Sequence, residues 1–200
     1  KLARSTPGCV FGECAQQDAY EFLGFLLCRI HEELSFDDMP SPLREMFEIA
    51  TVETLTRKCV VCGKVGISSE EQSSFGISLP LGDAPSLSLE SCLKLYTEPQ
   101  ELSTGRCQKC GNDCNVVHQI SLRQVPRYLI FHLKRFRCRR IGLTNANEPN
   151  AISISKLFTQ VDYPLKLDVK PFLYDGDVDA GSRSIFYETY AIVNHIGNSM

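Results

Sequence analysis

Cys59-Val60-Val61-Cys62-Gly63 and Cys107-Gln108-Lys109-Cys110-Gly111 are the two stretches around which this 200-residue chain is organised. Each is a C-x₂-C turn that aims two thiols at one point, and we call these turns the knuckles. The glycine that follows each pair lets the backbone close the turn with a positive φ. Together the knuckles offer the four soft ligands that a tetrahedral zinc ion prefers. The spacer between them, residues 64–106, is longer than the usual loop of a zinc ribbon, so the zinc would hold together the two ends of a long segment.

Two other interpretations of the cysteine pairs are open: unrelated pairs of buried thiols, or two disulfides. Zinc is favoured because the spacing and the flanking glycine repeat together. Four sulfur ligands leave no open position for water. We therefore predict a structural zinc ion, not a catalytic one, at Cys59, Cys62, Cys107 and Cys110.

The composition is that of an ordinary globular domain, with 43% hydrophobic and 22% charged residues. A net charge of −3 favours neither nucleic acid nor an anionic membrane as a partner. Ten cysteines, four of them in the knuckles, fit a reducing compartment, so we expect an intracellular protein of the cytoplasm or nucleus. There is no apolar run of membrane-spanning length and no signal peptide. The start at Lys1 without Met and the stop at Met200 suggest a fragment.

A helix is predicted over residues 15–34, where apolar side chains recur at steps of three and four. Asp18 and Glu21 share another face near the start of this helix, where carboxylates suit the helix dipole. By spacing alone, the dipole and a solvated helix face explain both carboxylates best.

Residues 88–96 also have helical spacing, with Ser88 as the expected cap. Alternation predicts strands over residues 51–56, 70–81 and 116–122.

A strand is predicted over residues 128–136, and residues 128–133 are apolar on both faces, as expected of a central strand that is buried on both sides. His132 lies within this run and is expected to be a hydrogen-bonded core histidine. Five cations follow between Lys134 and Arg140. They are a candidate nucleic-acid patch, but a solvated strand end explains them better because a strand divides them between two faces.

Five segments, in chain order, resemble motifs of the ubiquitin-specific protease family. They are similar to its QQDAxEFL helix, its SLxdCL…EL segment, and its LPxxLxxxLKRF, VxFPxxLdL and YxAVVNHxG strands. The segments are Gln16–Leu23, Ser88–Leu93 with Glu101-Leu102, Val125–Phe136, Val161–Leu167 and Tyr190–Gly197. The knuckles match the zinc ribbon of the family's fingers. Each motif is only suggestive, whereas the ordered set is highly specific.

The resemblance implies an α+β, papain-like cysteine peptidase fold shaped as thumb, palm and fingers. Residues 1–35 would be the end of the thumb with the ubiquitin-tail helix, and residues 36–125 the fingers with the zinc ribbon. Residues 126–200 would be strands of an antiparallel palm sheet, truncated before the catalytic histidine.

The family is a group of thiol proteases that hydrolyse the isopeptide bond after the C-terminal glycine of ubiquitin. The resemblance implies that Gln17, Asp18 and Glu21 line the channel for ubiquitin's extended, basic tail and hold it by charge-assisted hydrogen bonds. The implied partners are ubiquitin, ubiquitinated proteins and regulatory complex subunits, with no nucleic acid and no membrane. Short matches are most similar to the histone-directed members of the SAGA coactivator.

The chain departs from the family at the catalytic residues. Cys9 and Cys14 lack the Asn and Tyr neighbours of the family's nucleophile, and His195 matches a non-catalytic histidine. We therefore expect none of the Cys–His–Asp/Asn triad in this segment, which would supply ubiquitin binding and scaffold to an active complete chain. The alternatives are a catalytically dead ubiquitin-binding zinc scaffold and a zinc-ribbon nucleic-acid binder.

Overall fold

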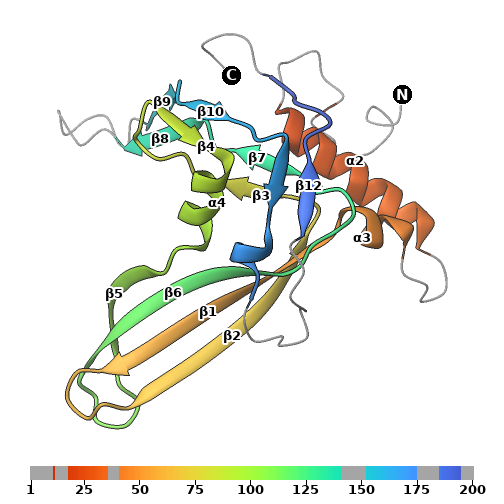
Figure 1. Cartoon of the computed structure of the whole chain (residues 1–200). Coiled ribbons are helices and arrows are strands. Elements are labelled where there is room, and N and C mark those ends of the chain that lie inside the picture. The colour runs from red at the N-terminus through yellow and green to blue at the C-terminus, as the bar shows by residue number, and fades with distance from the viewer. Residues whose placement is uncertain (1–10, 12–17, 36–40, 141–151, 175–184, 195–200) are drawn as a thin grey trace.

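The most extended feature of the protein is a four-stranded sheet with the order β2-β1-β6-β5, which we call the fingers (Figure 1). The computed structural model describes residues 11, 18–35, 41–140, 152–174 and 185–194. The strands of the fingers are β1 (Ile49–Cys59), β2 (Val65–Ser74), β5 (Gln100–Arg106) and β6 (Asp113–Gln124). In Figure 1 the sheet reaches away from the helices as a long, curved ribbon.

Both knuckles lie at the far end of the fingers because each is the turn of a hairpin. One hairpin joins β1 to β2 and the other joins β5 to β6. The central strands β1 and β6 run antiparallel, from the Ala50–Gln124 pair at the base to the Cys59–Cys114 pair at the tip. This register brings two turns that are far apart in sequence to one place.

The near end of the fingers enters the hydrophobic core. Helix α4 (Leu89–Thr97) packs on β6, on β3 (Ile77–Leu79) and on β4 (Ser86–Ser88). As predicted, Ser88 caps α4, and its side chain accepts a hydrogen bond from the Ser91 N–H. The buried core residues come from segments spread between positions 49 and 169: Ile49, Ile77, Leu79, Leu81, Leu89, Cys92, Leu93, Leu122, Val161, Leu167 and Val169.

In the described residues, the remaining strands form four two-stranded pairs. Two pairs are parallel, β3 with β7 (Phe131–Leu133) and β4 with β10 (Gln160–Asp162). Two are antiparallel, β8 (Phe136–Arg140) with β9 (Ile152–Lys156) and β11 (Lys166–Asp168) with β12 (Phe186–Glu188). The strands predicted to form an antiparallel palm sheet are therefore paired in both directions. Parallel pairs require long connections between their strands, and the fingers and the segments after them supply these connections. A short 3₁₀ helix, η2 (Lys170–Phe172), follows β11.

The single strand predicted over residues 70–81 is wrong, because the chain divides there into β2 and β3. Strand β2 is exposed along its whole length and pairs with β1 at the edge of the sheet, whereas β3 is part of the core. The division falls at Gly76, where an added Cβ would lie 3.1 Å from the Ile130 carbonyl oxygen and from the Tyr20 ring. Alternation cannot register such a close approach of a second segment.

The buried central strand predicted over residues 128–136 is also wrong. Strand β7 has three residues, all half-buried, and a turn follows in which the Arg135 N–H donates to the Leu133 carbonyl. The side chain of Arg135 donates to the Thr159 carbonyl at 2.7 Å, and Arg137 pairs with Asp83 at 2.5 Å. These two cations serve internal contacts, which disfavours the nucleic-acid patch.

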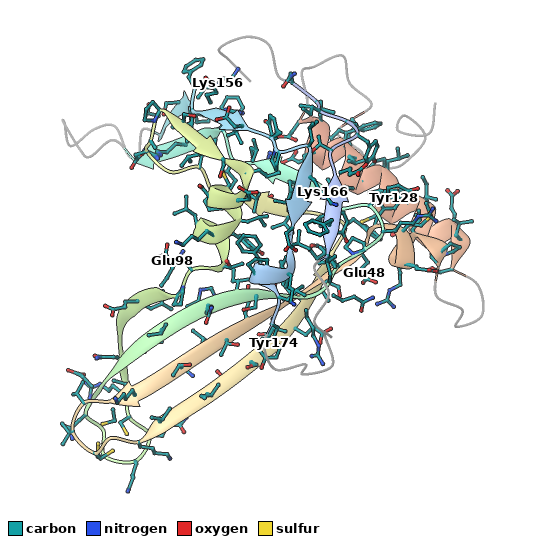
Figure 2. The ribbon with its side chains drawn as sticks, viewed as in Figure 1. Glu48, Glu98, Tyr128, Lys156, Lys166 and Tyr174 are labelled. Carbon is teal, nitrogen blue, oxygen red and sulfur yellow. The ribbon has the colours of Figure 1, made fainter. Side chains whose placement is uncertain are left out.

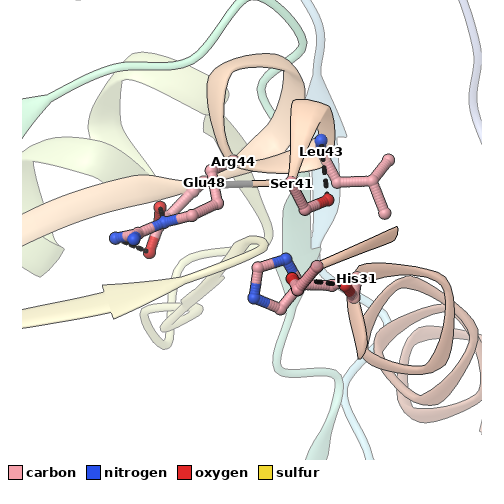
Figure 3. Close-up of polar contacts among 6 residues, drawn as sticks. His31, Ser41, Leu43, Arg44 and Glu48 are labelled. Carbon is pink, nitrogen blue, oxygen red and sulfur yellow. Dashed lines mark hydrogen bonds and ion pairs between the residues drawn. The ribbon is translucent and has the colours of Figure 1, made fainter. Parts of the chain in front are cut away.

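Helices α2 (Ala19–Leu34) and α3 (Pro42–Phe47) lie at the end of the molecule opposite the knuckles (Figure 1). Figure 3 shows the polar contacts where they meet: the Ser41 hydroxyl accepts from the Leu43 N–H, and Arg44 pairs with Glu48. Helix α2 begins four residues later than the predicted start at residue 15, because Asp18 caps it. No helix in the described part of the chain is both long enough and apolar enough to cross a bilayer.

Candidate functional site

The four knuckle cysteines converge on one point at the tip of the fingers, where Figure 2 shows sulfur atoms gathered. Their sulfurs all lie within 4.8 Å of one another. The shortest separations run between the knuckles, 3.5 Å from Cys59 Sγ to Cys110 Sγ and 3.7 Å from Cys62 Sγ to Cys107 Sγ. A disulfide is about 2.05 Å long, and all four cysteines are free in the structure.

This geometry fits zinc. With a zinc–sulfur bond of about 2.3 Å, neighbouring sulfurs of a tetrahedron lie about 3.8 Å apart, close to the distances between the knuckles. Gly63 and Gly111 have φ values of 66° and 72°, as the sequence predicted, and their N–H groups donate to the carbonyls of Cys59 and Cys107. The two turns are therefore equivalent in backbone as well as in sequence.

The backbone of the knuckles also prepares the sulfurs to ligate a cation. The N–H groups of Cys62 and Val61 point at the Cys59 sulfur and lower the pKa of this thiol to about 6. Those of Cys110 and Lys109 lower the pKa of Cys107 in the same way. Because zinc binds thiolates, both shifts favour the form that ligates. Although the Lys64 N–H acts to lower the pKa of Cys62, the neighbouring knuckle sulfurs raise this pKa to about 11, so without a cation the four sulfurs do not all ionise together.

Cys114 is a fifth cysteine at the tip of the fingers, and it is buried like Cys59 and Cys107. No role for it was predicted from the sequence. It is the cross-strand partner of Cys59 and packs with Cys59 and Cys107 beneath the cluster. Burial raises the pKa of its thiol, so it is a small apolar support for the ligands. The alternation along β6, in which Cys114, Val116 and His118 share a face, is the signal that places it there.

The second candidate site is the acidic start of α2. Oδ1 of Asp18 accepts hydrogen bonds from the N–H groups of Tyr20 at 2.7 Å and Glu21 at 3.1 Å. Asp18 is thus the N-cap of the helix, which bears out the dipole interpretation. Both bonds use one carboxylate oxygen, and Glu21 next to it is exposed. Gln17 lies outside the described residues.

A cavity of about 480 Å³ lies beside this acidic start, between α2 and the chain from Ser73 to Gly76. Leu23, Leu27 and Phe75 give it an apolar floor, whereas Glu21 and Glu48 give it negative charge. Figure 2 labels Glu48 beside the two helices. An apolar surface with carboxylates suits a basic, partly apolar peptide.

His132 is hydrogen-bonded, as predicted, but it is half-buried and not a core residue. Its Nδ1 lies 3.0 Å from the Ser78 hydroxyl, and its ring stacks on Tyr20 of α2. The other cysteines and histidine considered as catalytic candidates, Cys9, Cys14 and His195, lie outside the described residues.

Comparison with known proteins identifies the family. The model of the family described as ubiquitin carboxyl-terminal hydrolase matches residues 4–200. Ubiquitin carboxyl-terminal hydrolase Usp2 of Drosophila melanogaster is 28% identical over 230 residues, which cover 100% of this chain and 22% of that protein. Human ubiquitin carboxyl-terminal hydrolase 2 is 28% identical over 220 residues, covering 92% of this chain and 33% of that protein. The chain therefore spans between a fifth and about a third of these relatives.

A solved structure confirms the fold. The SAGA Ubp8/Sgf11/Sus1/Sgf73 DUB module bound to ubiquitin aldehyde matches with a TM-score of 0.69 at 24% identity, over 92% of this chain and 40% of that one. It agrees with the papain-like fold predicted from the sequence. Members of the matched family are cysteine-type hydrolases. Because the family model matches residues 4–200, nearly the whole chain, the chain belongs to the ubiquitin carboxyl-terminal hydrolase family.

Proposed function

We propose that the protein is a thiol-dependent deubiquitinase that hydrolyses the isopeptide bond after the C-terminal glycine of ubiquitin. In this proposal, the segment described above binds ubiquitin and forms the scaffold, and the nucleophile and base lie elsewhere in the complete chain. Residues 1–35 are the end of the thumb, 36–125 the fingers and 126–200 the palm strands. The observation that carries the proposal is the acidic start of α2 beside an apolar cavity, in a chain that belongs to this family.

Gln17, Asp18 and Glu21 are proposed to bind the basic tail of ubiquitin. Asp18 and Glu21 are three residues apart at the start of α2, a spacing that brings two side chains to neighbouring positions, so one basic segment can reach both carboxylates. Such charge-assisted bonds are stronger than neutral ones, and removing one costs about 1–3 kcal/mol.

A structural zinc ion at Cys59, Cys62, Cys107 and Cys110 is the second part of the proposal. The ion would hold the two hairpins of the fingers together at their tip. With four protein ligands it has no position for a reacting water, so its contribution is to the shape of the ubiquitin-binding surface.

The decisive experiment measures hydrolysis of a ubiquitin–fluorophore conjugate by the complete protein. We expect turnover by the complete protein, and ubiquitin binding without turnover by residues 1–200 alone. Sustained turnover by the 200-residue segment would contradict the placement of the triad elsewhere. Binding without turnover by the complete protein would instead support a catalytically dead ubiquitin-binding scaffold.

The role of the carboxylates is tested separately from their role in the helix. Asn caps a helix about as well as Asp, so Asp18→Asn removes the charge and keeps the cap. We expect Asp18→Asn and Glu21→Gln each to weaken ubiquitin binding roughly 5- to 100-fold, corresponding to about 1–3 kcal/mol. Glu33→Gln, an exposed charge at the other end of α2, is the matched control. If all three variants bind ubiquitin as tightly as the wild type, Asp18 and Glu21 do not contact the tail of ubiquitin.

A further inference from the structure

The first turn of α2 is joined to the core by a stacked pair of rings. The rings of Tyr20 and His132 are 4.4 Å apart and inclined by 9°. His132 belongs to β7, so this contact ties the helix to the parallel β3–β7 pair. Tyr20 stands at the position that the family's QQDAxEFL motif leaves open.

The stack is held from the side by β3. The Ser78 hydroxyl lies 3.0 Å from His132 Nδ1. Burial raises the pKa of the Tyr20 hydroxyl, and a hydrogen bond from the Ser78 side chain offsets part of this rise. Ser78 thus contacts both rings. Gly76 leaves the space that Tyr20 fills, since a Cβ there would lie 3.1 Å from its ring and hydroxyl.

The ring pair is connected to the acidic start of α2 through the backbone. The N–H group that donates to Asp18 Oδ1 at 2.7 Å belongs to Tyr20 itself. By fixing the Tyr20 side chain against β7, the stack restrains the backbone of the residue whose N–H orients the Asp18 carboxylate. Glu21 is the next residue along the same turn. Asp18 and Glu21 also act electrostatically on His132, which places all three groups in one neighbourhood.

We propose that Tyr20 and His132 are positioning residues, which hold the carboxylates of Asp18 and Glu21 in the orientation that binds the basic tail of ubiquitin. This inference rests on the proposed function. Neither ring needs to touch ubiquitin, because the stack acts through the Tyr20 N–H and the first turn of α2.

The test is a double-mutant cycle in the complete protein, with Tyr20→Leu crossed with Asp18→Asn. Tyr20→Leu removes the stack and keeps an apolar side chain, and we expect it to raise KM for a ubiquitin–fluorophore conjugate roughly three- to tenfold with kcat unchanged. In the Asp18→Asn background the same change should have little further effect, because the carboxylate it positions is gone. Tyr20→Phe keeps the stack and should restore most of the binding. Leu34→Gln, at the exposed end of α2, controls for a general effect on the helix.

Several outcomes would overturn the inference. One is an unchanged KM in Tyr20→Leu. Another is that the effects of Tyr20→Leu and Asp18→Asn on KM add strictly while the variants keep equal thermal stability. A third is that Tyr20→Leu lowers kcat and leaves KM unchanged. The proposed function fails differently, because wild-type protein would then neither hydrolyse nor bind ubiquitin. If the wild type binds ubiquitin without turnover, the Kd for ubiquitin replaces KM in the same double-mutant cycle and decides whether the rings position the carboxylates.

Discussion

At the scale of single residues, the carboxylate of Asp18 serves the fold and is also proposed to bind a ligand. Its Oδ1 satisfies two N–H groups of the first turn of α2, which any helix start needs. The sequence predicted the charge and its place near the helix start, and the family motif predicted its ligand. The cap itself, and the stack of Tyr20 on His132, depend on backbone geometry and on a strand more than a hundred residues away.

Gly63 and Gly111 yield a prediction about the knuckles. Both have positive φ, and nothing lies within 4 Å of an added Cβ at either position, so backbone strain is the whole cost of a side chain there. We expect Gly111→Ala to destabilise the zinc-loaded protein by about 1–2 kcal/mol, and Gly111→Asn by less, because Asn tolerates the left-handed region. Urea unfolding measures both. Gly66→Ala, at an open position without positive φ, is the control, and equal stability of the two alanine variants would contradict this account.

His132 makes the stability of the fold depend on pH. Burial lowers its pKa below the ordinary value of 6.5, whereas Asp18 and Glu21 act in the opposite direction and Lys134 acts with burial. The folded state therefore binds fewer protons than the unfolded state. Its stability is fully present above pH 6.5 and falls as the pH drops from there through the folded-state pKa.

We expect the free energy of unfolding of the wild type to fall more steeply below pH 6.5 than that of His132→Gln. Urea unfolding at several pH values between 7.5 and 5, a range roughly centred on an ordinary histidine pKa, measures the difference. The zinc ligands titrate in both proteins, so their effect cancels in the comparison. A constant difference between wild type and variant at every pH would show that His132 does not titrate in this range.

At the scale of elements, α4 is the helix that the sequence predicted best and the structure uses most. Its face of Leu89, Cys92 and Leu93 is buried, and it contacts β3, β4, β6 and η2. The elements that the sequence missed are those fixed by another segment. Strand β5 pairs with β6 although its own residues alternate weakly, and β2 ends where Gly76 meets Ile130 and Tyr20. Local periodicity carries no information about either contact.

Helix α4 therefore gives a graded prediction. Leu93 is fully buried in the core, so Leu93→Ala should cost about 2–5 kcal/mol through lost contacts and a cavity. Ser88→Ala removes only the cap and should cost about 1 kcal/mol. Lys94→Ala, at an exposed position on the same helix, should change stability by less than about 0.5 kcal/mol. Chemical unfolding of the three variants tests the order, and a Leu93→Ala variant as stable as Lys94→Ala would show that α4 does not anchor the core.

At the scale of the whole molecule, the fingers are supported at two separate places. Their base enters the main core through Ile49 and Leu122, and their tip holds the small cluster of Cys59, Cys107 and Cys114. Between these places β1 is only half-buried or exposed, and β2 is exposed throughout. The middle of the sheet thus depends on backbone pairing and on whatever joins the two hairpins at the tip.

Removal of zinc should therefore loosen the tip of the fingers and leave the core at their base folded. Structural zinc contributes roughly 10–16 kcal/mol in small zinc peptides, which is more than the exposed middle of the sheet can replace. After chelation we expect amide hydrogen exchange to accelerate in residues 55–66 and 105–117, while α4 and the bases of β1 and β6 stay protected. Cys62→Ser with Cys110→Ser should reproduce the pattern without chelator, and added zinc should reverse it only in the wild type. If protection is lost everywhere at once, the fingers and the core form one cooperative unit, and the metal supports the whole fold instead of the ubiquitin-binding surface alone.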